Sequence, residues 1–384
     1  MTTTIERIVD LAIQIQQIAA PTFHEQERAK FVCKLFEEEG LKNVMIDDAG
    51  NVYGRWTVDN GKLKDVKPLV VSAHLDTVFP FDMDLSVKRE DDKVYGIGIG
   101  DNSLGVAALF GLIWMLRERQ RSSQSLASPK RAPEGRGGGI GDIWFVANTC
   151  EEGLGDLRGM KAVADRFGSD VLAYLILEGM ALGHVYHKAV GVKRYRITAR
   201  TQGGHSWSDY GQPSAVLELS KLIMQLAALK LPSHPRTTLN VGKVQGGTSI
   251  NVIPAEAWME LDLRSEGQDE LAELVEGVEK LIEAANKPEV RMETEVIGAR
   301  PAGEISADHP LIKLALRCLH GLELDAVLTS GSTDANIPLS KGYSALVLGV
   351  TMGGGAHTKN EFIALPPVEK GMEQLVRFVE KVWE

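Results

Sequence analysis

Four short, almost wholly apolar runs constrain the fold of this 384-residue chain more than any other feature of its sequence. They are PLVVSA at 68–73, IWFVAN at 143–148, LAYLIL at 172–177 and SALVLGV at 344–350. Runs of this kind are typical of strands that are buried on both faces of a sheet. Helical stretches separate them, notably 104–118 after a glycine-rich turn, so we predict an α/β sheet with helices on both sides.

The segments around these runs are also interpretable. Apolar residues recur at three- and four-residue steps in 4–19 and 24–39, which predicts two helices, the second ended by Gly40. The segment 119–141 is rich in Ser, Arg, Pro and Gly and has no apolar period. We therefore expect it to form a mobile surface loop.

The pattern of elements changes between about 188 and 298. The expected elements alternate in the order strand, helix, strand, strand, helix, strand, at 191–200, 213–229, 237–244, 256–264, 269–285 and 290–297. This βαββαβ order is that of the split ferredoxin-like unit. Because the apolar α/β pattern resumes near 309, we predict that a domain of residues 188–300 is inserted into one made of 1–187 and 301–384.

Composition narrows the classes of function. The chain has 52 acidic and 42 basic residues and no long basic run, so we do not expect nucleic acid as a partner. We expect neither export nor membrane insertion, since there is no basic segment followed by an apolar block and no uncharged apolar run of about 18 residues. Three widely spaced cysteines without a C-x-x-C motif favour neither disulfides nor a thiolate metal site. A cytoplasmic location is the expectation.

Each of the four apolar runs is followed by side chains that can bind metal. In chain order they are His74 and Asp76, Glu151 and Glu152, Glu178, and His357 after a glycine-rich turn; Asp101 precedes the helix at 104–118. Ligand sites form at the carboxyl ends of strands in open α/β sheets, so these groups are expected to converge. Imidazoles and carboxylates without thiolates suit Zn, Mn or Co in a hydrolytic site.

The chain also resembles a known family over nearly its whole length. The motifs SAHLDTVFP, GIGIGDNSLG, CEEGLGDLRGM, LEG, GGHSWSDYGQPSA, GGTSINVIPAEAWMELDLRS and GGGAHTKNEF occur in order. Together they resemble metallopeptidase family 20, which includes peptidase T, glutamate carboxypeptidase, acetylornithine deacetylase and aminoacylase. The resemblance implies a zinc-peptidase α/β catalytic domain, a mixed sheet flanked by helices, with an inserted ferredoxin-like lid and dimerisation domain.

The resemblance implies a centre of two zinc ions, with Co²⁺ or Mn²⁺ as alternatives. Asp101 would bridge the two ions, with His74 and Glu178 completing one and Glu152 and His357 the other. Asp76 would fix the tautomer of His74 by accepting a hydrogen bond from its ring. Glu151 would be the general base that moves a proton from water to the leaving amine.

Further roles implied by the resemblance concern substrate and assembly. His205 would help to hold the substrate carbonyl oxygen, reaching the neighbouring subunit's active site in a homodimer. Asn251 and Arg264 would engage the substrate carboxylate, and Ser332 belongs to a loop, GSTDANI at 331–337, that resembles a substrate pocket. The peptide bond between Asp101 and Asn102 is expected to be cis.

Simpler or competing interpretations of several residues stay open. Arg264 could be a surface strand residue paired with a nearby acid. The H-x-x-H pair His184 and His187 is disfavoured as a metal site because it flanks an expected strand junction. The glycines at 96, 98 and 100 are disfavoured as a dinucleotide-binding loop because Asp101, which follows them, would repel pyrophosphate. Cys150 could be a nucleophile, but its place at an apolar strand end favours a buried structural thiol.

These observations lead to one principal function and two alternatives. We expect a metallopeptidase that cleaves an amide bond of short peptides by metal-activated water, as a dipeptidase, tripeptidase or aminopeptidase. The first alternative is a deacylase of N-acyl amino acids, which shares the chemistry and differs only in the pocket. The second is a non-catalytic binding protein on the same scaffold.

Overall fold

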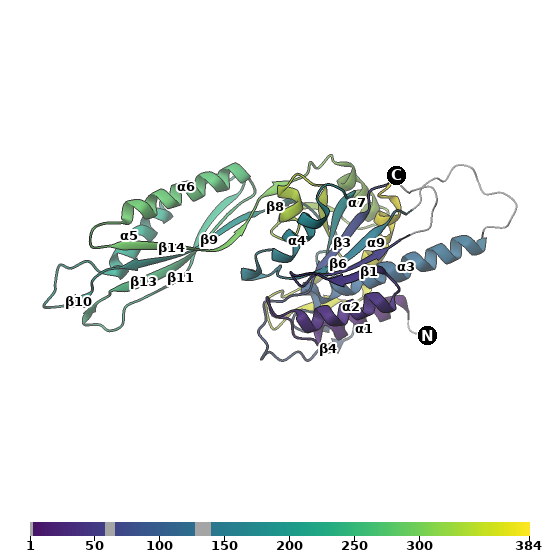
Figure 1. The fold of residues 1–384 in the computed structure, drawn as a ribbon, viewed down its shortest axis with the longest axis horizontal. Coiled ribbons are helices and arrows are strands. Elements are labelled where there is room, and N and C mark those ends of the chain that lie inside the picture. The colour runs from purple at the N-terminus through teal and green to yellow at the C-terminus, as the bar shows by residue number, and fades with distance from the viewer. Residues whose placement is uncertain (1–2, 58–65, 127–139) are drawn as a thin grey trace. The chain divides into compact units, whose positions relative to one another are not determined.

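The computed structural model describes residues 3–57, 66–126 and 140–384, which form two compact units (Figure 1). The first unit consists of Met1–His187 and Glu304–Glu384, and the second of Lys188–Gly303. The second unit is therefore an insertion in the chain of the first. Each unit has its own hydrophobic core.

A mixed sheet forms the centre of the first unit. Its strands follow the order β1 (Lys42–Ile46), β2 (Val52–Trp56), β6 (Ile143–Asn148), β3 (Leu69–His74), β7 (Ala173–Glu178), β17 (Ala345–Gly349), β8 (His184–Ala189) and β15 (Gly303–Glu304), and β16 (Val327–Gly331) pairs with β8. The central strands β6, β3, β7 and β17 are parallel to one another, and the pairs β2–β6 and β17–β8 are antiparallel. These four strands are the four apolar runs, so the prediction of an α/β sheet with doubly buried strands is confirmed.

Helices cover this sheet. They are α1 (Thr4–Gln16), α2 (Gln26–Glu38), α3 (Leu104–Leu126), α4 (Arg158–Phe167), α7 (Pro310–His320), α8 (Asn336–Ser340) and α9 (Pro366–Lys381). A capping box between Thr3 and Glu6 starts α1, and Gly40 follows α2 with a φ of 66°, as expected for a residue that ends a helix. Helix α3 packs against α1, α9 and β3.

Among the described residues, one helical stretch is long and apolar enough to cross a membrane by length and composition alone. It is Ile99–Ser122, which includes most of α3. In the structure, 89% of its apolar window is buried. The apolar character of α3 is therefore that of a core helix, which packs on both α1 and the central sheet.

The prediction of a loop from 119 onward is wrong over its first eight residues. Helix α3 continues to Leu126, and residues 127–139 of the predicted loop lie outside the described residues. Apolar periodicity reports burial, and so it stops where a helix leaves the core. Arg, Gln and Glu still favour helix in such an extension. Arg119, within it, donates hydrogen bonds to Glu373 and Glu380 of α9.

This contact gives a prediction about acid stability. Burial alone would raise the pKa of Glu373, but hydrogen bonds from Arg377 and Arg119 hold it below its usual value. A carboxylate with a depressed pKa contributes stability above its unfolded-state pKa and loses it as the pH falls. We expect Glu373→Gln to lower the free energy of unfolding by about 1 kcal/mol at neutral pH, and by progressively less as the pH falls below about 4.3 and through the depressed pKa of Glu373. Urea denaturation at several pH values, with exposed Glu369→Gln as the control, checks this.

A second, smaller sheet lies in the first unit. Its order is β18 (Gly353–Gly354), β19 (Phe362–Ala364), β5 (Lys93–Tyr95) and β4 (Lys88–Glu90). The pairing of β19 with β5 brings the C-terminal segment that carries His357 next to the segment that precedes Asp101. These strands are too short to give an alternating pattern, and none of them was expected from the sequence.

The second unit is a four-stranded antiparallel sheet with two helices. Its order is β11 (Thr237–Gly246), β13 (Glu256–Ser265), β9 (Gly191–Arg200) and β14 (Arg291–Arg300). Helices α5 (Ala215–Ala227) and α6 (Gln268–Ala285) pack on β9 and β13, and their apolar faces share one core with the alternate residues of these strands. The predicted βαββαβ order is confirmed. A two-stranded ribbon of β10 (Gly204–His205) and β12 (Val252–Ile253) is additional.

Candidate metal centre

The metal-binding side chains predicted in the first unit all lie near the carboxyl ends of the central parallel strands. His74 is the last residue of β3 and Glu178 the last of β7, while Glu151 and Glu152 follow β6. The remaining two predicted ligands stand on turns: Asp101 on the short π-helical turn η1 (Ile99–Ser103), and His357 between β18 and β19. Because β3, β6 and β7 run in the same direction, these strand ends share one edge of the sheet.

Asp101 is the side chain that connects the two histidines. Its Oδ1 lies 3.1 Å from His74 Nε2, and its Oδ2 lies 3.0 Å from His357 Nε2. The Nε2 atom of His74 is also 3.8 Å from Glu178 Oε2, and that of His357 is 3.0 Å from Glu152 Oε1. Each imidazole thus faces Asp101 and one further carboxylate.

The donor atoms fall into three overlapping groups in which all atoms lie within 4.8 Å of one another. These groups are His74, Asp101 and Glu178; Asp101, Glu152 and His357; and His74, Glu151 and Glu152. The first two share only Asp101, so this arrangement suits two cations with one carboxylate between them. The donor chemistry, two imidazoles with several carboxylates and no thiolate, fits a divalent metal centre.

The electrostatics of the site also fit bound cations. Burial and the neighbouring carboxylates raise the pKa of Glu178 well above its usual value. Burial alone would lower the pKa of His74, but hydrogen bonds to Asp101 and Asp76 raise it well above its usual value. Hydrogen bonds to Asp101 and Glu152 raise the pKa of His357 to about 10. An excess of buried negative charge therefore surrounds both imidazoles, and divalent cations would neutralise it.

Asp76 contacts both His74 and the loop of Glu151 and Glu152, whereas the sequence indicated only the contact with His74. His74 Nδ1 lies 3.1 Å from the backbone oxygen of Asp76 and 3.5 Å from its Oδ1, so both can fix the ring. The same carboxylate accepts hydrogen bonds from the backbone N–H groups of Glu151 and Glu152, each at 2.9 Å. Asp76, which is fully buried, therefore positions the loop of the two glutamates as well as the imidazole.

The loop before these glutamates is anchored by residues that the sequence did not point to. Glu25 accepts a hydrogen bond from the backbone N–H of Cys150 at 3.0 Å, and Asn51 Oδ1 accepts one from Thr149 at 3.0 Å. Cys150 is itself buried, and burial raises the pKa of its thiol to about 12. A thiol with this pKa is a poor nucleophile, which favours the structural interpretation of Cys150.

The glycine-rich turn before Asp101 is organised by Glu361, another residue that the sequence reasoning missed. Its carboxylate accepts hydrogen bonds from the backbone N–H groups of Gly98, Gly100 and Asp101, at 2.9, 2.8 and 2.9 Å. Glu361 is fully buried, and burial raises its pKa to about 7. These N–H groups are already engaged by a carboxylate, which excludes the dinucleotide-loop interpretation. Its position in the motif GGGAHTKNEF was the signal available.

Replacing Glu361 by alanine is expected to be costly. Three buried backbone N–H groups would lose their acceptor, and each unsatisfied group costs on the order of 1–3 kcal/mol. We expect Glu361→Ala to lower the free energy of unfolding by about 3 kcal/mol or more and to weaken metal binding, because the turn that carries Asp101 loses its anchor. Urea denaturation and calorimetric metal titration measure the two effects. Exposed Glu283→Ala is the control, and wild-type values for Glu361→Ala would contradict this role.

The peptide bond between Asp101 and Asn102 is cis, as predicted. Asn102 is fully buried, and its side chain joins the turn to the end of β7. It donates to the carbonyl oxygen of Leu177 at 2.9 Å and accepts from the backbone N–H of Gly179 at 2.8 Å. The turn is thus held on one side by Glu361 and on the other by β7.

The loop that contains Ser332 follows β16 in the first unit. Within it, Asp334 is fully buried and accepts a hydrogen bond from Asn148 Nδ2 at 2.7 Å. The charge of Asp334 contributes to the raised pKa of Glu178. The loop therefore lies near the candidate centre through Asp334, whereas the role of Ser332 stays a prediction.

Three predicted substrate-binding residues belong to the second unit and are described within it. The exposed His205 lies on β10, and its Nδ1 accepts hydrogen bonds from the backbone N–H groups of Trp207 and Ser208, at 3.2 and 3.3 Å. Asn251 Oδ1 accepts one from the hydroxyl group of Ser249 at 2.9 Å. Arg264 donates its Nε–H to Asp262 at 2.6 Å. This is the pairing with a nearby acid that the sequence left open.

His184 and His187 do not form a joint site. Both lie on β8, where an odd spacing puts them on opposite faces. His184 is exposed, while His187 is buried with its Nδ1 2.8 Å from the carbonyl oxygen of Ile305.

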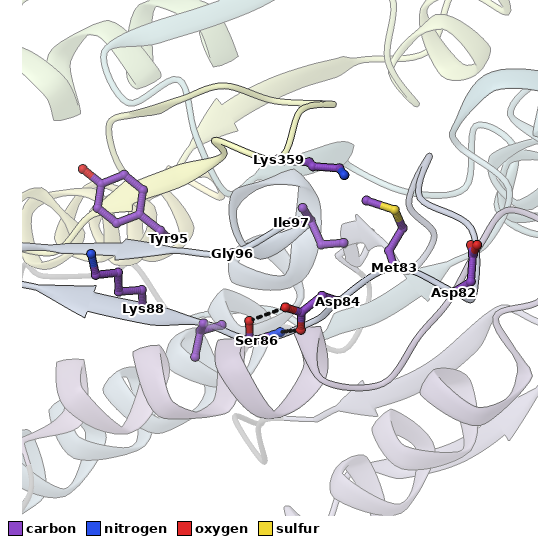
Figure 2. A pocket seen from close by; sticks show the side chains of 10 residues that line it. Asp82, Met83, Asp84, Ser86, Lys88, Tyr95, Gly96, Ile97 and Lys359 are labelled. Carbon is purple, nitrogen blue, oxygen red and sulfur yellow. Dashed lines mark hydrogen bonds between the residues drawn. The ribbon is translucent and has the colours of Figure 1, made fainter.

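A cavity of about 570 Å³ lies beside the segments that lead to the turns of the candidate metal ligands Asp101 and His357 (Figure 2). Its lining includes Gly96 and Ile97, just before the glycine-rich turn, and Lys359, two residues after His357. Asp84 also lines the cavity, and its carboxylate accepts hydrogen bonds from the backbone N–H and the hydroxyl group of Ser86 (Figure 2). The lining carries both acidic and basic side chains and does not select one ligand class.

The chain matches known proteins along most of its length. The model of the peptidase dimerisation domain matches residues 188–290, and that of peptidase family M28 matches residues 51–187. A peptidase M20 domain-containing protein of Schizosaccharomyces pombe is 25% identical over 97% of this chain and 84% of that protein. Succinyl-diaminopimelate desuccinylase of Corynebacterium glutamicum is 26% identical over 76% of this chain and 75% of that protein. The crystal structure of aminopeptidase PepT from Bacillus cereus is similar in fold, with a TM-score of 0.79 and 23% identity over 99% of both chains.

Proposed function

We propose that the chain is a member of metallopeptidase family 20 and a dizinc exopeptidase that hydrolyses an amide bond of short peptides. The observation that carries this proposal is the pair of three-donor groups that share Asp101, with Glu151 beside them. Similarity to peptidases in sequence and fold supports it.

The bound cations would lower the pKa of a water molecule and polarise the amide carbonyl group. Glu151 lies in the three-donor group with His74 and Glu152, and it is in neither of the two groups that contain Asp101. If those two groups hold the cations, the carboxylate of Glu151 is available as the general base. It would take the proton of the attacking water and give it to the leaving amine. Asp76 holds the backbone of Glu151 and Glu152 in place and so orients the base.

The second unit would supply substrate contacts and the subunit interface. Its match to a peptidase dimerisation domain supports a homodimer. In that arrangement His205 would donate a hydrogen bond to the substrate carbonyl oxygen in the neighbouring subunit. Asn251 and Arg264 would bind the substrate carboxylate, and Arg264 would leave its hydrogen bond with Asp262 to do so. Ser332 would line the substrate pocket. The enzyme is proposed to act in the cytoplasm.

Deacylation of N-acyl amino acids is the second candidate. The desuccinylase of Corynebacterium glutamicum, which is similar over 76% of this chain, supports it. The metal centre would act on an amide bond in both reactions. The contacts that distinguish a peptide from an N-acyl amino acid would lie in the substrate pocket instead.

Mass spectrometry of a mixed substrate panel tests the proposal. The panel contains dipeptides, tripeptides and N-acyl amino acids, incubated with zinc- or cobalt-loaded protein with and without a chelator. Chelator-sensitive loss of peptides supports the peptidase and shows which terminus is trimmed. Loss of only the acylated amino acids would move the enzyme to the deacylases.

A further inference from the structure

Four exposed apolar side chains cluster on the loops around Asp76. They are Phe23, Val78, Phe81 and Leu154, with exposed fractions of 39%, 39%, 60% and 62%. We call this set the apolar rim. Single exposed apolar residues are ordinary on protein surfaces, whereas several that gather in one place can mark a binding site.

Hydrogen bonds and contacts show that the loops of the apolar rim touch one another. The backbone N–H of Thr22 donates to the carbonyl oxygen of Thr77 at 3.3 Å, next to an isolated bridge between Pro21 and Thr77. A Cβ atom added at Gly155 would lie 2.7 Å from Thr22 Cγ2, so the loop of Leu154 packs against the loop of Phe23. The ring of His24, next to Phe23, lies 5.3 Å from that of Phe81.

The apolar rim is also tied to the candidate centre. Asp76 Oδ2 accepts hydrogen bonds from the hydroxyl group of Thr22 and from the backbone N–H of Glu152, both at 2.9 Å. Phe23 follows Thr22 directly, Val78 comes two residues after Asp76, and Leu154 two residues after Glu152. Two residues span at most about 7 Å, so these side chains start close to the metal-binding edge.

Local hydrogen bonds hold the backbone beneath the apolar rim. Phe79 N–H donates to Thr77 Oγ1 at 3.2 Å, and Gly155 N–H donates to the carbonyl oxygen of Glu152 at 2.8 Å. Phe23 has a φ of 74°, a conformation that costs energy in a non-glycine residue and is concentrated at functional sites. The guanidinium of Arg158 lies 5.0 Å from the centre of its ring.

From this placement we infer that the apolar rim is a subsite for an apolar side chain adjacent to the amide bond that is cleaved. The inference rests on the proposed function and adds a substrate class to it: peptides with a leucine-like residue beside the scissile bond. When the cleaved bond of a peptide lies at the candidate metal centre, the side chain of the flanking peptide residue can reach the apolar rim. Val78 and Leu154 of the rim come only two residues after Asp76 and Glu152. A second copy of the chain is the competing occupant.

The test compares tripeptides that differ only in having leucine or serine at one position, for each position in turn. The wild-type, zinc-loaded protein is expected to prefer leucine at a position flanking the cleaved bond by about tenfold in kcat/KM. The double variant Phe81→Ala and Leu154→Ala should lose about tenfold for the leucine peptide, mainly through KM, and stay within about twofold for the serine peptide. Met45→Ala, an exposed apolar residue of β1, is the control and should change neither.

Two measurements keep this test independent of turnover. Calorimetric binding of the same peptides to metal-loaded Glu151→Gln protein should show the same preference for leucine and the same loss in the variant carrying both alanine substitutions. Light scattering follows the oligomeric state of the double variant. The inference would be overturned if the protein hydrolysed and bound the leucine and serine peptides equally well. It would also be overturned if the double variant dissociated into monomers and kept its preference for leucine. Failure to hydrolyse any peptide contradicts the proposed function alone, because the binding assay still decides the subsite.

Discussion

Glu151→Gln is expected to reduce turnover by about 10²- to 10⁴-fold while metal content stays at the wild-type level. The amide cannot accept the proton of the attacking water, yet it has nearly the same size as the carboxylate. The backbone N–H of Glu151 would still donate to Asp76, so the loop should keep its shape. Steady-state kinetics on the best peptide of the panel, with metal content measured by atomic absorption, gives both values.

The matched control for this variant is Glu27→Gln, since Glu27 is an exposed carboxylate of α2. It should behave as wild type. Turnover of Glu151→Gln within a few-fold of wild type would show that another group moves the proton. A loss of activity accompanied by a loss of metal would instead identify Glu151 as a ligand, in keeping with its place beside His74 and Glu152.

Asp101→Asn is expected to have the largest effect on metal binding. One carboxylate faces both imidazoles, with different oxygens at 3.1 and 3.0 Å, so the substitution removes a charge from both three-donor groups at once. Mutation of residues that merely support metal ligands already costs about 10- to 100-fold in affinity, and a shared ligand should cost at least about 100-fold. Competition with a chromophoric chelator measures the affinities, and the visible spectrum of the cobalt-loaded protein reports the ligand set.

The comparison variant for Asp101→Asn is Glu178→Gln, which alters only one of the two groups. It should weaken one ion and spare the other, whereas Asp101→Asn should weaken both. Retention of two tightly bound ions by Asp101→Asn would rule out a bridging role for this carboxylate.

The sequence predicted the central strands well because burial on both faces leaves an unbroken apolar run. It also located the side chains that converge, since residues at the ends of neighbouring parallel strands must meet at one edge. His74 and Glu178 are of this type. The edge strand β1 is largely exposed, and in β8, which lies outside the parallel centre of the sheet, buried and less buried residues alternate, so neither gave such a signal.

The supporting residues could not be predicted in the same way. Glu25 and Glu361 act by accepting hydrogen bonds from backbone N–H groups that are distant in the chain. A buried carboxylate of this kind looks in sequence like any surface glutamate. The helical extension after residue 118 was missed for a related reason. Its polar residues lie outside the core, so they favour a helix by intrinsic propensity but show no apolar periodicity.

The central claim is that amide hydrolysis depends on two divalent ions held around Asp101. Its most direct test is titration of chelator-treated protein with zinc or cobalt while peptide hydrolysis is followed under tight-binding conditions. We expect almost no activity without metal and a rise that is complete at two equivalents per chain. Full activity of the metal-free protein, or a plateau at one equivalent with the second ion unbound, would contradict the account.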